Sequence, residues 1–172
     1  MRLFIAINFE ERIKDEIQSI AKEVKESSIK GKFVNKEHIH LTLEFLGDIH
    51  SNRVEEIKDI MNKIEFEPFT MELENIGFFK RRDGNIYWLG IKHSEKLLEL
   101  QSRLHRLLLE KGFKLEDRAY KPHITLGRRV NVKDDFDMEN LSNSVQDISI
   151  FVDKIDLMKS EHINGKLVYS IV

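Results

Sequence analysis

The chain lacks cysteine, long apolar segments and an excess of basic residues. The absence of cysteine excludes disulfides, thiolate nucleophiles and Cys-based zinc sites, so a nucleophile must be an oxygen, a histidine, a lysine or an activated water. No apolar run approaches the length of a bilayer-spanning helix. The opening MRLFIAINFE soon turns acidic and has no small-residue cleavage site, which predicts a strand rather than a signal peptide and, by default, a cytoplasmic location.

Charge is abundant but balanced. Charged residues make up 34% of the 172 residues and hydrophobic residues 41%, which is enough for a packed interior beneath a well-solvated surface. The formal net charge is −2, whereas proteins that hold long duplex nucleic acid through many phosphates usually carry a basic excess. For a nucleic-acid ligand, this balance predicts a small contact with one end, one loop or one nucleotide.

Hydrophobic periodicity predicts an alternation of strands and helices. Apolar residues recur at every second position in the expected strands and at every third or fourth position in the expected helices. Strands are expected at 2–8, 38–46, 69–79, 85–91, 122–129, 148–158 and 167–172. Helices are expected at 9–25, from 51 or 52 to 64, and between the cap Ser94 and the terminating Gly112. Gly31 is interpreted as a stop or turn, and the polar segment 131–147 as a loop with a short helix.

The chain carries one short motif twice. His40-Leu41-Thr42-Leu43 recurs as His123-Ile124-Thr125-Leu126, an offset of 83 residues from position 40 to position 123. The same offset brings Ile5 of the first expected strand onto Trp88, and it superimposes the first expected helix on the third. A match in motif and in flanking elements together predicts a duplicated unit.

The duplication predicts a fold as well as a site. No linker rich in proline, glycine or serine separates the halves, so we expect a single domain, 1–172, made of two pseudo-symmetric lobes in direct contact. One lobe is expected to contain roughly 1–80 plus the C-terminal strands, and the other 81–172.

The doubled motif points to acid–base chemistry. On a strand, residues i and i+2 share a face, so His40 lies beside Thr42, and His123 lies beside Thr125. Across a cleft, one neutral histidine can take a proton from water while the protonated one gives a proton to the leaving oxygen of a phosphodiester. Histidine suits both roles because its ordinary pKa lies near neutrality. This scheme needs no metal or other cofactor.

Other residues complete this candidate site. The hydroxyls of Thr42 and Thr125 can donate hydrogen bonds to non-bridging phosphate oxygens, and Arg128 can add a charged fork to the same phosphate. Tyr120, three residues before His123, is the candidate for stacking on a base. Trp88, within an expected buried strand, is interpreted as a core residue.

Several residues have competing interpretations. His38 lies on the expected strand face of His40 and is its rival, but only His40 has a threonine two residues later, so His38 is interpreted as a rim residue. His105 is expected at a packing boundary. The basic run Lys80-Arg81-Arg82 lies beside the expected hairpin turn at Asp83-Gly84, where a solvated tip is favoured over a contact with RNA. The remaining histidines are expected at the surface: His50, His93 and His162.

At this point the sequence resembles a known family. The opening MRLFIAI, the segments HLTLEFLGDI and YKPHITLGR, and the C-terminal DLMKS and NGKLVYSIV resemble the RNA 2′,3′-cyclic phosphodiesterases, or LigT-type 2′-5′ RNA ligases, of the 2H phosphoesterase superfamily. The resemblance implies a bilobal α+β fold in which two antiparallel sheets line a central cleft and helices pack outside. It implies hydrolysis of RNA 2′,3′-cyclic phosphate ends to 2′-phosphates, and it allows the reverse reaction, 2′-5′ ligation.

The resemblance also assigns roles. It implies that His40 is the proton donor, that His123 is the proton acceptor, and that Thr42 and Thr125 bind phosphate. Arg128 falls where the family carries an arginine after its second motif. The departures are small: Lys80 stands where a proline is common, and Tyr120 where a phenylalanine is common.

Three alternatives remain open from the residues. The same groups can serve a ligase that joins tRNA-like ends, because microscopic reversibility uses one set of groups for both directions. A non-catalytic RNA-binding module is disfavoured by the missing basic excess. A metal hydrolase would use His38, His40 and His123, but no carboxylate is evident as a further ligand. The expected partner is an RNA end or a cyclic nucleotide, with no membrane or protein partner and a monomeric state.

Overall fold

The computed structural model describes residues 1–172 and contains two antiparallel sheets with helices outside them. The strands are β1 (Arg2–Asn8), β2 (Ser28–Phe33), β3 (His40–Asp48), β4 (Phe69–Phe79), β5 (Asn85–Ile91), β6 (His123–Val132), β7 (Ser149–Val152), β8 (Asp156–Ile163) and β9 (Lys166–Ile171). The helices are α1 (Glu11–Glu26), α2 (Val54–Asn62), α3 (Glu95–Glu110) and α4 (Met138–Val145), with 3-10 turns η1 (Lys36–His38) and η2 (Ser51–Arg53). The expected α+β class is confirmed.

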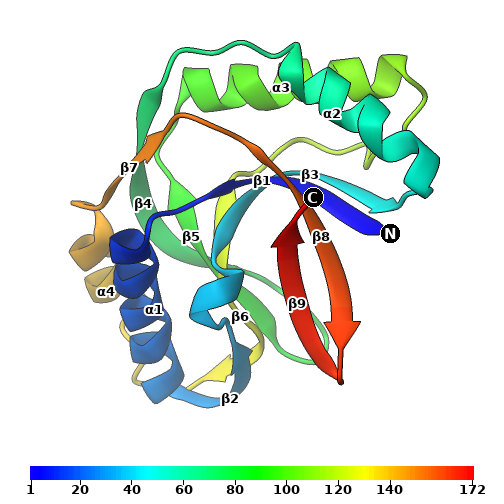
Figure 1. The fold of residues 1–172 in the computed structure, drawn as a ribbon. Helices are drawn as coiled ribbons and strands as arrows, with labels where there is room; N and C mark the ends of the chain where they lie inside the picture. Colours follow the sequence, from blue (N-terminus) through cyan, green and yellow to red (C-terminus); the bar gives the residue numbers. More distant parts are fainter.

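The two motif strands lie in different sheets. The first sheet has the order β3-β1-β8-β9, and the second has the order β2-β6-β5-β4-β7. Each half of the duplication supplies one strand–helix–strand unit, β1-α1-β3 or β5-α3-β6, in which the two strands pair directly and antiparallel. Figure 1 shows α2 and α3 together on one side of the molecule and α1 and α4 together on the other.

The helix of each unit packs on the sheet of the other unit. Helix α1 follows β1 of the first sheet but contacts β2 and β6 of the second, and α3 follows β5 of the second sheet but contacts β3 of the first. The lobes are therefore interleaved. The expected boundary near residue 80 is not where the sheets divide, because β2 and β4 precede it and belong to the second sheet. Motif spacing does not show which sheet each strand joins, so it could not predict this interleaving.

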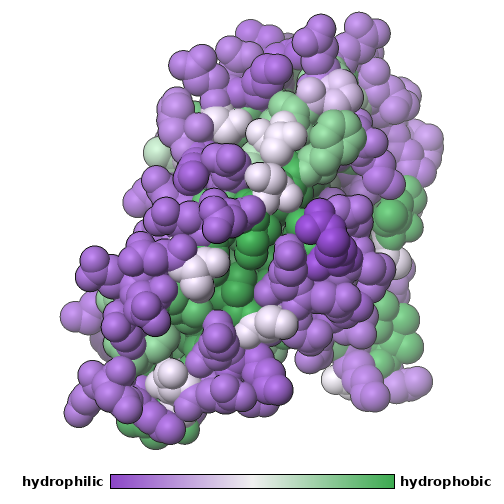
Figure 2. Space-filling view, turned by 90° about the vertical axis from the view of Figure 1, so that its left-hand side faces the viewer, coloured by the Kyte–Doolittle hydropathy of each residue, from purple (hydrophilic) through white to green (hydrophobic).

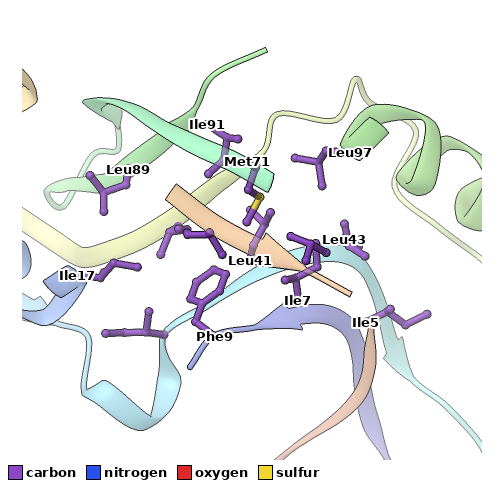
Figure 3. Packing of buried hydrophobic residues seen from close by; sticks show 14 of the residues in the cluster. Ile5, Ile7, Phe9, Ile17, Leu41, Leu43, Met71, Leu89, Ile91 and Leu97 are labelled. Carbon is purple, nitrogen blue, oxygen red and sulfur yellow. The ribbon is translucent and has the colours of Figure 1, made fainter. Parts of the chain in front are cut away.

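One continuous apolar core joins the sheets and helices. Its buried residues include alternate positions of the motif strand β3 and of its neighbour β1. Examples are Leu41 and Leu43 of β3 and Ile5 and Ile7 of β1 (Figure 3). Burial of such side chains is the main free energy that stabilises the fold. A second, small cluster of Phe4, Ala6 and Met158 lies on the opposite face of β1.

Two strand predictions needed correction. Strand β2 was expected to be a turn around Gly31, because its sequence SIKGKF has exposed polar side chains and no apolar alternation; it forms because it pairs with the edge of β6. The expected strand 148–158 is two strands, since β7 pairs with β4 in the second sheet and β8 pairs with β1 in the first. The polar segment 131–147 contains the expected short helix, α4.

The surface is largely polar. Figure 2 shows the side of the molecule that carries α1 and α4, where hydrophilic residues dominate and apolar side chains gather in a strip along a hollow. None of the helices is long and apolar enough to cross a lipid bilayer.

Candidate active site between the two motif strands

The structure brings the two motifs together. Strands β3 and β6 come from different sheets and contact each other. The hydroxyl of Tyr120, just before β6, donates a hydrogen bond of 2.7 Å to the backbone carbonyl of Thr42 on β3. The two imidazoles are close enough for the charge of His123 to lower the pKa of His40.

Both histidine rings are held in the same way. The Nδ1 atom of His40 lies 2.7 Å from the carbonyl oxygen of His38, and Nδ1 of His123 lies 2.7 Å from the carbonyl oxygen of Lys121. A carbonyl oxygen only accepts hydrogen bonds, so each Nδ1 carries a proton and each Nε2 is left for chemistry. The carbonyl comes from the residue two positions earlier in both motifs, a relation that strand alternation does not predict.

The two threonines share this arrangement only in part. The hydroxyl of Thr42 lies 2.9 Å from Nε2 of His40, so it donates to the neutral ring. Thr125 occupies the corresponding position beside His123, and its hydroxyl makes no hydrogen bond in the structure. Both residues are half-buried on the strand face of their histidine, as the i, i+2 spacing predicts.

Burial and positive charge act together on the histidines. Burial is the main cause that lowers the pKa of His40 to about 4, and the charges of His38, Arg128 and His123 lower it further. Burial also lowers the pKa of His123, with contributions from Arg128 and Arg118. Both rings are therefore neutral at pH 7 in the free protein. A bound anion would oppose these effects and favour protonation.

A β-bulge puts Arg128 on the histidine face. Its distance of five residues from His123 is odd, so simple alternation would put the two on opposite faces. However, Thr125 pairs with Trp88 and Gly127 pairs with Tyr87, so β6 holds one extra residue at this point. The bulge shifts the alternation by one position. The guanidinium accordingly lowers the pKa of both His40 and His123.

The first motif strand has a matching bulge. Thr42 pairs with Ala6 and Glu44 pairs with Ile5, so β3 also holds one extra residue at the end of its motif. The offset of the duplication makes Phe45 the counterpart of Arg128. Phe45 is 52% exposed, and its ring lies 6.2 Å from that of Phe4. The two halves thus share a β-bulge, but only the second half carries a charged side chain after it.

Aromatic rings surround both imidazoles. The ring of His40 lies 4.9 Å from Phe4 and 5.6 Å from Tyr169 between centroids. The ring of His123 lies 5.1 Å from Phe79, edge to face, and 6.4 Å from Trp88. Trp88 was expected in the core, but it is half-buried beside the site. Tyr169 and Phe79 lie on strands remote from the motifs, and no spacing signal identifies them.

Two sequence interpretations change with the geometry. His38 lies on η1 rather than on the strand of His40; its Nε2 is 3.1 Å from the carbonyl oxygen of Leu167, and its ring packs on Tyr169. It therefore anchors β9 and supplies the carbonyl that orients His40. Tyr120 is half-buried and uses its hydroxyl to join the motif strands. Base stacking by its ring stays a prediction.

His105 is at a packing boundary, as expected, and takes part in a polar cluster. Its Nδ1 lies 2.8 Å from Oε2 of Glu44, a carboxylate that is 7% exposed and also accepts a hydrogen bond from Gln101. Burial raises the pKa of Glu44. No set of three or more histidine, aspartate or glutamate side chains converges in a geometry that could hold a metal ion.

The comparison with protein families agrees with this geometry. The chain matches the family described as the 2′-5′ RNA ligase superfamily over residues 9–164, which is most of its length. The chain belongs to the 2′-5′ RNA ligase superfamily. The resemblance that the paired motifs carry, to the 2H phosphoesterases, is thereby confirmed.

Members of the superfamily that resemble this chain share a name. A protein of Archaeoglobus fulgidus named RNA 2′,3′-cyclic phosphodiesterase is 32% identical over 130 residues, covering 74% of this chain and 72% of its own. A protein of the same name from Methanothermobacter thermautotrophicus is 29% identical and covers 94% of this chain and 90% of its own. The crystal structure of Escherichia coli LigT with 3′-AMP has a TM-score of 0.82 at 24% identity, over 99% of this chain and 94% of that one, which shows a shared fold.

Proposed function

We propose that this protein hydrolyses RNA 2′,3′-cyclic phosphate ends to 2′-phosphate ends, with His40 as proton donor and His123 as proton acceptor. One observation carries the proposal: two imidazoles from the two motif strands each have Nδ1 fixed by a carbonyl, which leaves Nε2 for proton transfer. The names of the relatives support the same chemistry.

The reaction uses both imidazoles on one phosphorus atom. Nε2 of His123 accepts a proton from water as the water oxygen bonds to phosphorus. The bond from phosphorus to the 3′ oxygen breaks, and Nε2 of His40 protonates that oxygen, which leaves a 3′-hydroxyl and a 2′-phosphate. Each positioned acid or base contributes about 10² to 10⁴-fold to such a rate.

The surrounding donors stabilise the charge that develops on the phosphate. The hydroxyls of Thr42 and Thr125 donate hydrogen bonds to the non-bridging oxygens, and Arg128 supplies a full positive charge. In this scheme the hydroxyl of Thr42 turns from Nε2 of His40 to the phosphate when the substrate binds. Binding of the anionic phosphate raises the pKa of His40, and this protonates the donor when it is needed.

The test uses a dinucleotide that ends in a 2′,3′-cyclic phosphate, incubated with and without EDTA. We expect a 2′-phosphate product at equal rates in both reactions. We expect His40→Ala and His123→Ala each to lose nearly all turnover while circular dichroism stays that of the unaltered protein. A 3′-phosphate product, loss of turnover with the chelator, or a fully active His123→Ala protein would each contradict the proposal.

A second candidate function is 2′-5′ ligation of tRNA-like RNA ends. The family description favours it, and the same groups provide its chemistry when an RNA 5′-hydroxyl attacks phosphorus in place of water. Cleavage of a 2′-5′-linked dinucleotide runs the ligation backwards: the 3′-hydroxyl attacks phosphorus, the bond to the 5′ oxygen breaks, and a 5′-hydroxyl product leaves. Comparing the rate of this cleavage with the rate of hydrolysis of the cyclic end separates the two roles. The metal-hydrolase alternative loses support because the ring of His38 faces the carbonyl of Leu167 instead of His40.

A further inference from the structure

Exposed basic side chains come from three separate segments of the second sheet and its β4–β5 hairpin. They are Lys30 and Lys32 on β2, Arg81 at the tip of the β4–β5 hairpin, and Arg128 on β6. All four are exposed, and none of them forms an ion pair in the structure. Because the whole chain has a formal net charge of −2, this positive surface is a local feature rather than a reflection of composition.

The pairing of β2 with β6 puts Lys32 on the face of the histidines. Lys32 is the direct partner of Arg128, and partners in an antiparallel pair share a face. Phe33, the next residue, packs against the core and so points the other way. Lys32 therefore lies beside Arg128, on the face that carries the two histidines. Lys30, two residues along β2, pairs with Asn131, and the register shifts between the two lysines.

A chain of contacts links Arg81 to His123. The guanidinium carbon of Arg81 lies 5.8 Å from the centroid of the Phe79 ring, and that ring lies 5.1 Å from the ring of His123. The nearby carboxylate of Asp83 is already engaged, since it lies 3.2 Å from Nε of Arg129. That ion pair joins the hairpin tip to β6 and leaves the charge of Arg81 unopposed.

We propose that Lys30, Lys32 and Arg81, here termed the basic rim, bind backbone phosphates of the nucleotides upstream of the cyclic end. The inference rests on the proposed function and adds to it a binding site for the RNA chain upstream of the cyclic end. Cationic side chains along a groove are how proteins hold a single strand without reading its sequence. Under this proposal, the basic hairpin tip, which is interpreted from the sequence as solvated, binds RNA phosphates.

The experiment compares two triple variants on two substrates. The rim variant is K30Q/K32Q/R81Q, and the control is K22Q/K63Q/K96Q, which removes three exposed lysines that make no ion pair, on the helices α1 and α3 and at the end of α2. The substrates are a ten-nucleotide RNA ending in a 2′,3′-cyclic phosphate and a 2′,3′-cyclic mononucleotide. For each protein, kcat/KM is measured on each substrate over a range of salt concentrations.

We expect the rim variant to lose about tenfold in kcat/KM on the ten-nucleotide RNA near physiological salt, and its log–log salt slope to shrink by about 2, since a single strand releases about 0.7 counterion per contact. Turnover of the mononucleotide should stay within about twofold, because its phosphate reaches only the histidines, the threonines and Arg128. The control variant should resemble the unaltered protein on both substrates.

The proposal is overturned if the rim variant keeps its kcat/KM on the RNA, if the control loses as much, or if turnover of the mononucleotide falls equally. Should the unaltered protein turn over neither substrate, the proposed function fails separately. In that case, fluorescence anisotropy measures the affinity of each protein for the same RNA ending in a 2′-phosphate. Weaker and less salt-dependent binding by the rim variant alone supports phosphate binding by the basic rim. Equal binding by both variants refutes it.

Discussion

The half-sites around His40 and His123 have the same motif and different surroundings. In both, Nδ1 is held by a carbonyl two residues earlier and a threonine follows two residues later. However, β3 is an edge strand that pairs only with β1, whereas β6 lies between β2 and β5. Nε2 of His40 already accepts a hydrogen bond from Thr42, while Nε2 of His123 has no partner in the structure.

The contrast extends to the position after each bulge. The first half carries Phe45 and the second half carries Arg128, so one cation serves both histidines. The duplicated backbone makes the imidazoles equivalent in orientation, and neighbours from other strands make them unequal in polarity. Two motifs with the same histidine and threonine can therefore differ in environment through residues outside the motifs.

The largest expected effect tests how the roles are divided. On a dinucleotide that ends in a 2′,3′-cyclic phosphate, His40→Ala and His123→Ala should each lower kcat by about 10² to 10⁴-fold. On bis(p-nitrophenyl) phosphate, whose leaving group needs no proton, His40→Ala should recover most of its activity, whereas His123→Ala should not. Recovery by His123→Ala instead, followed through p-nitrophenolate release, would show that the roles are reversed.

Arg128→Gln tests whether one cation serves both halves. Removal of its charge should raise the pKa of both histidines, because a positive neighbour disfavours the imidazolium form. NMR titration of the imidazole resonances measures this shift. We also expect kcat/KM to fall by about 100-fold, since Arg128 would stabilise charge on the phosphate.

The matched control for this prediction is the adjacent Arg129→Gln. Arg129 is paired with Asp83, and its charge is not among the causes that shift the pKa of either histidine. It should leave both pKa values unchanged, and it should leave kcat/KM unchanged on a 2′,3′-cyclic mononucleotide, which does not reach the basic rim. A shift confined to one histidine in Arg128→Gln would mean that the halves do not share the cation.

Stability between pH 4 and 6.5 should report the burial of His40. Its pKa is about 4 in the folded protein and near 6.5 when unfolded, so in this window the unfolded chain binds more protons and stability rises with pH. His40→Gln should flatten the rise by about 2 kcal/mol, measured by urea unfolding at a series of pH values. A larger flattening in His123→Gln would contradict the deeper burial of His40.

The smallest expected effect concerns the link between the half-sites. Tyr120→Phe removes the donor to the carbonyl of Thr42 and should lower the free energy of unfolding by about 1 to 2 kcal/mol. We expect kcat to fall by up to about tenfold, because the motif strands are no longer fixed to each other. Tyr87→Phe is the control, since the hydroxyl of Tyr87 makes no hydrogen bond in the structure. Equal effects in both variants would argue against the link.

Local patterns predicted much of the fold. The bounds of β4 and β5 agree with the expected 69–79 and 85–91, because β4 begins with a regular alternation over 69–74 and the turn Asp83-Gly84 separates the two strands. Strand β2 was missed because its only strand partner, β6, is about a hundred residues away along the chain and its own side chains are solvated. The division of 148–158 between two sheets was missed for the same reason.

The sequence by itself determined that two His–Thr pairs stand on two strands, because side-chain alternation depends only on neighbours along the chain. Tertiary structure decided which carbonyls hold the rings, how strongly each pKa shifts, and that Arg128 faces both histidines. It also decided that α1 and α3 each pack on the sheet of the other unit. These features depend on bulges and on contacts between remote segments, whose geometry no local pattern contains.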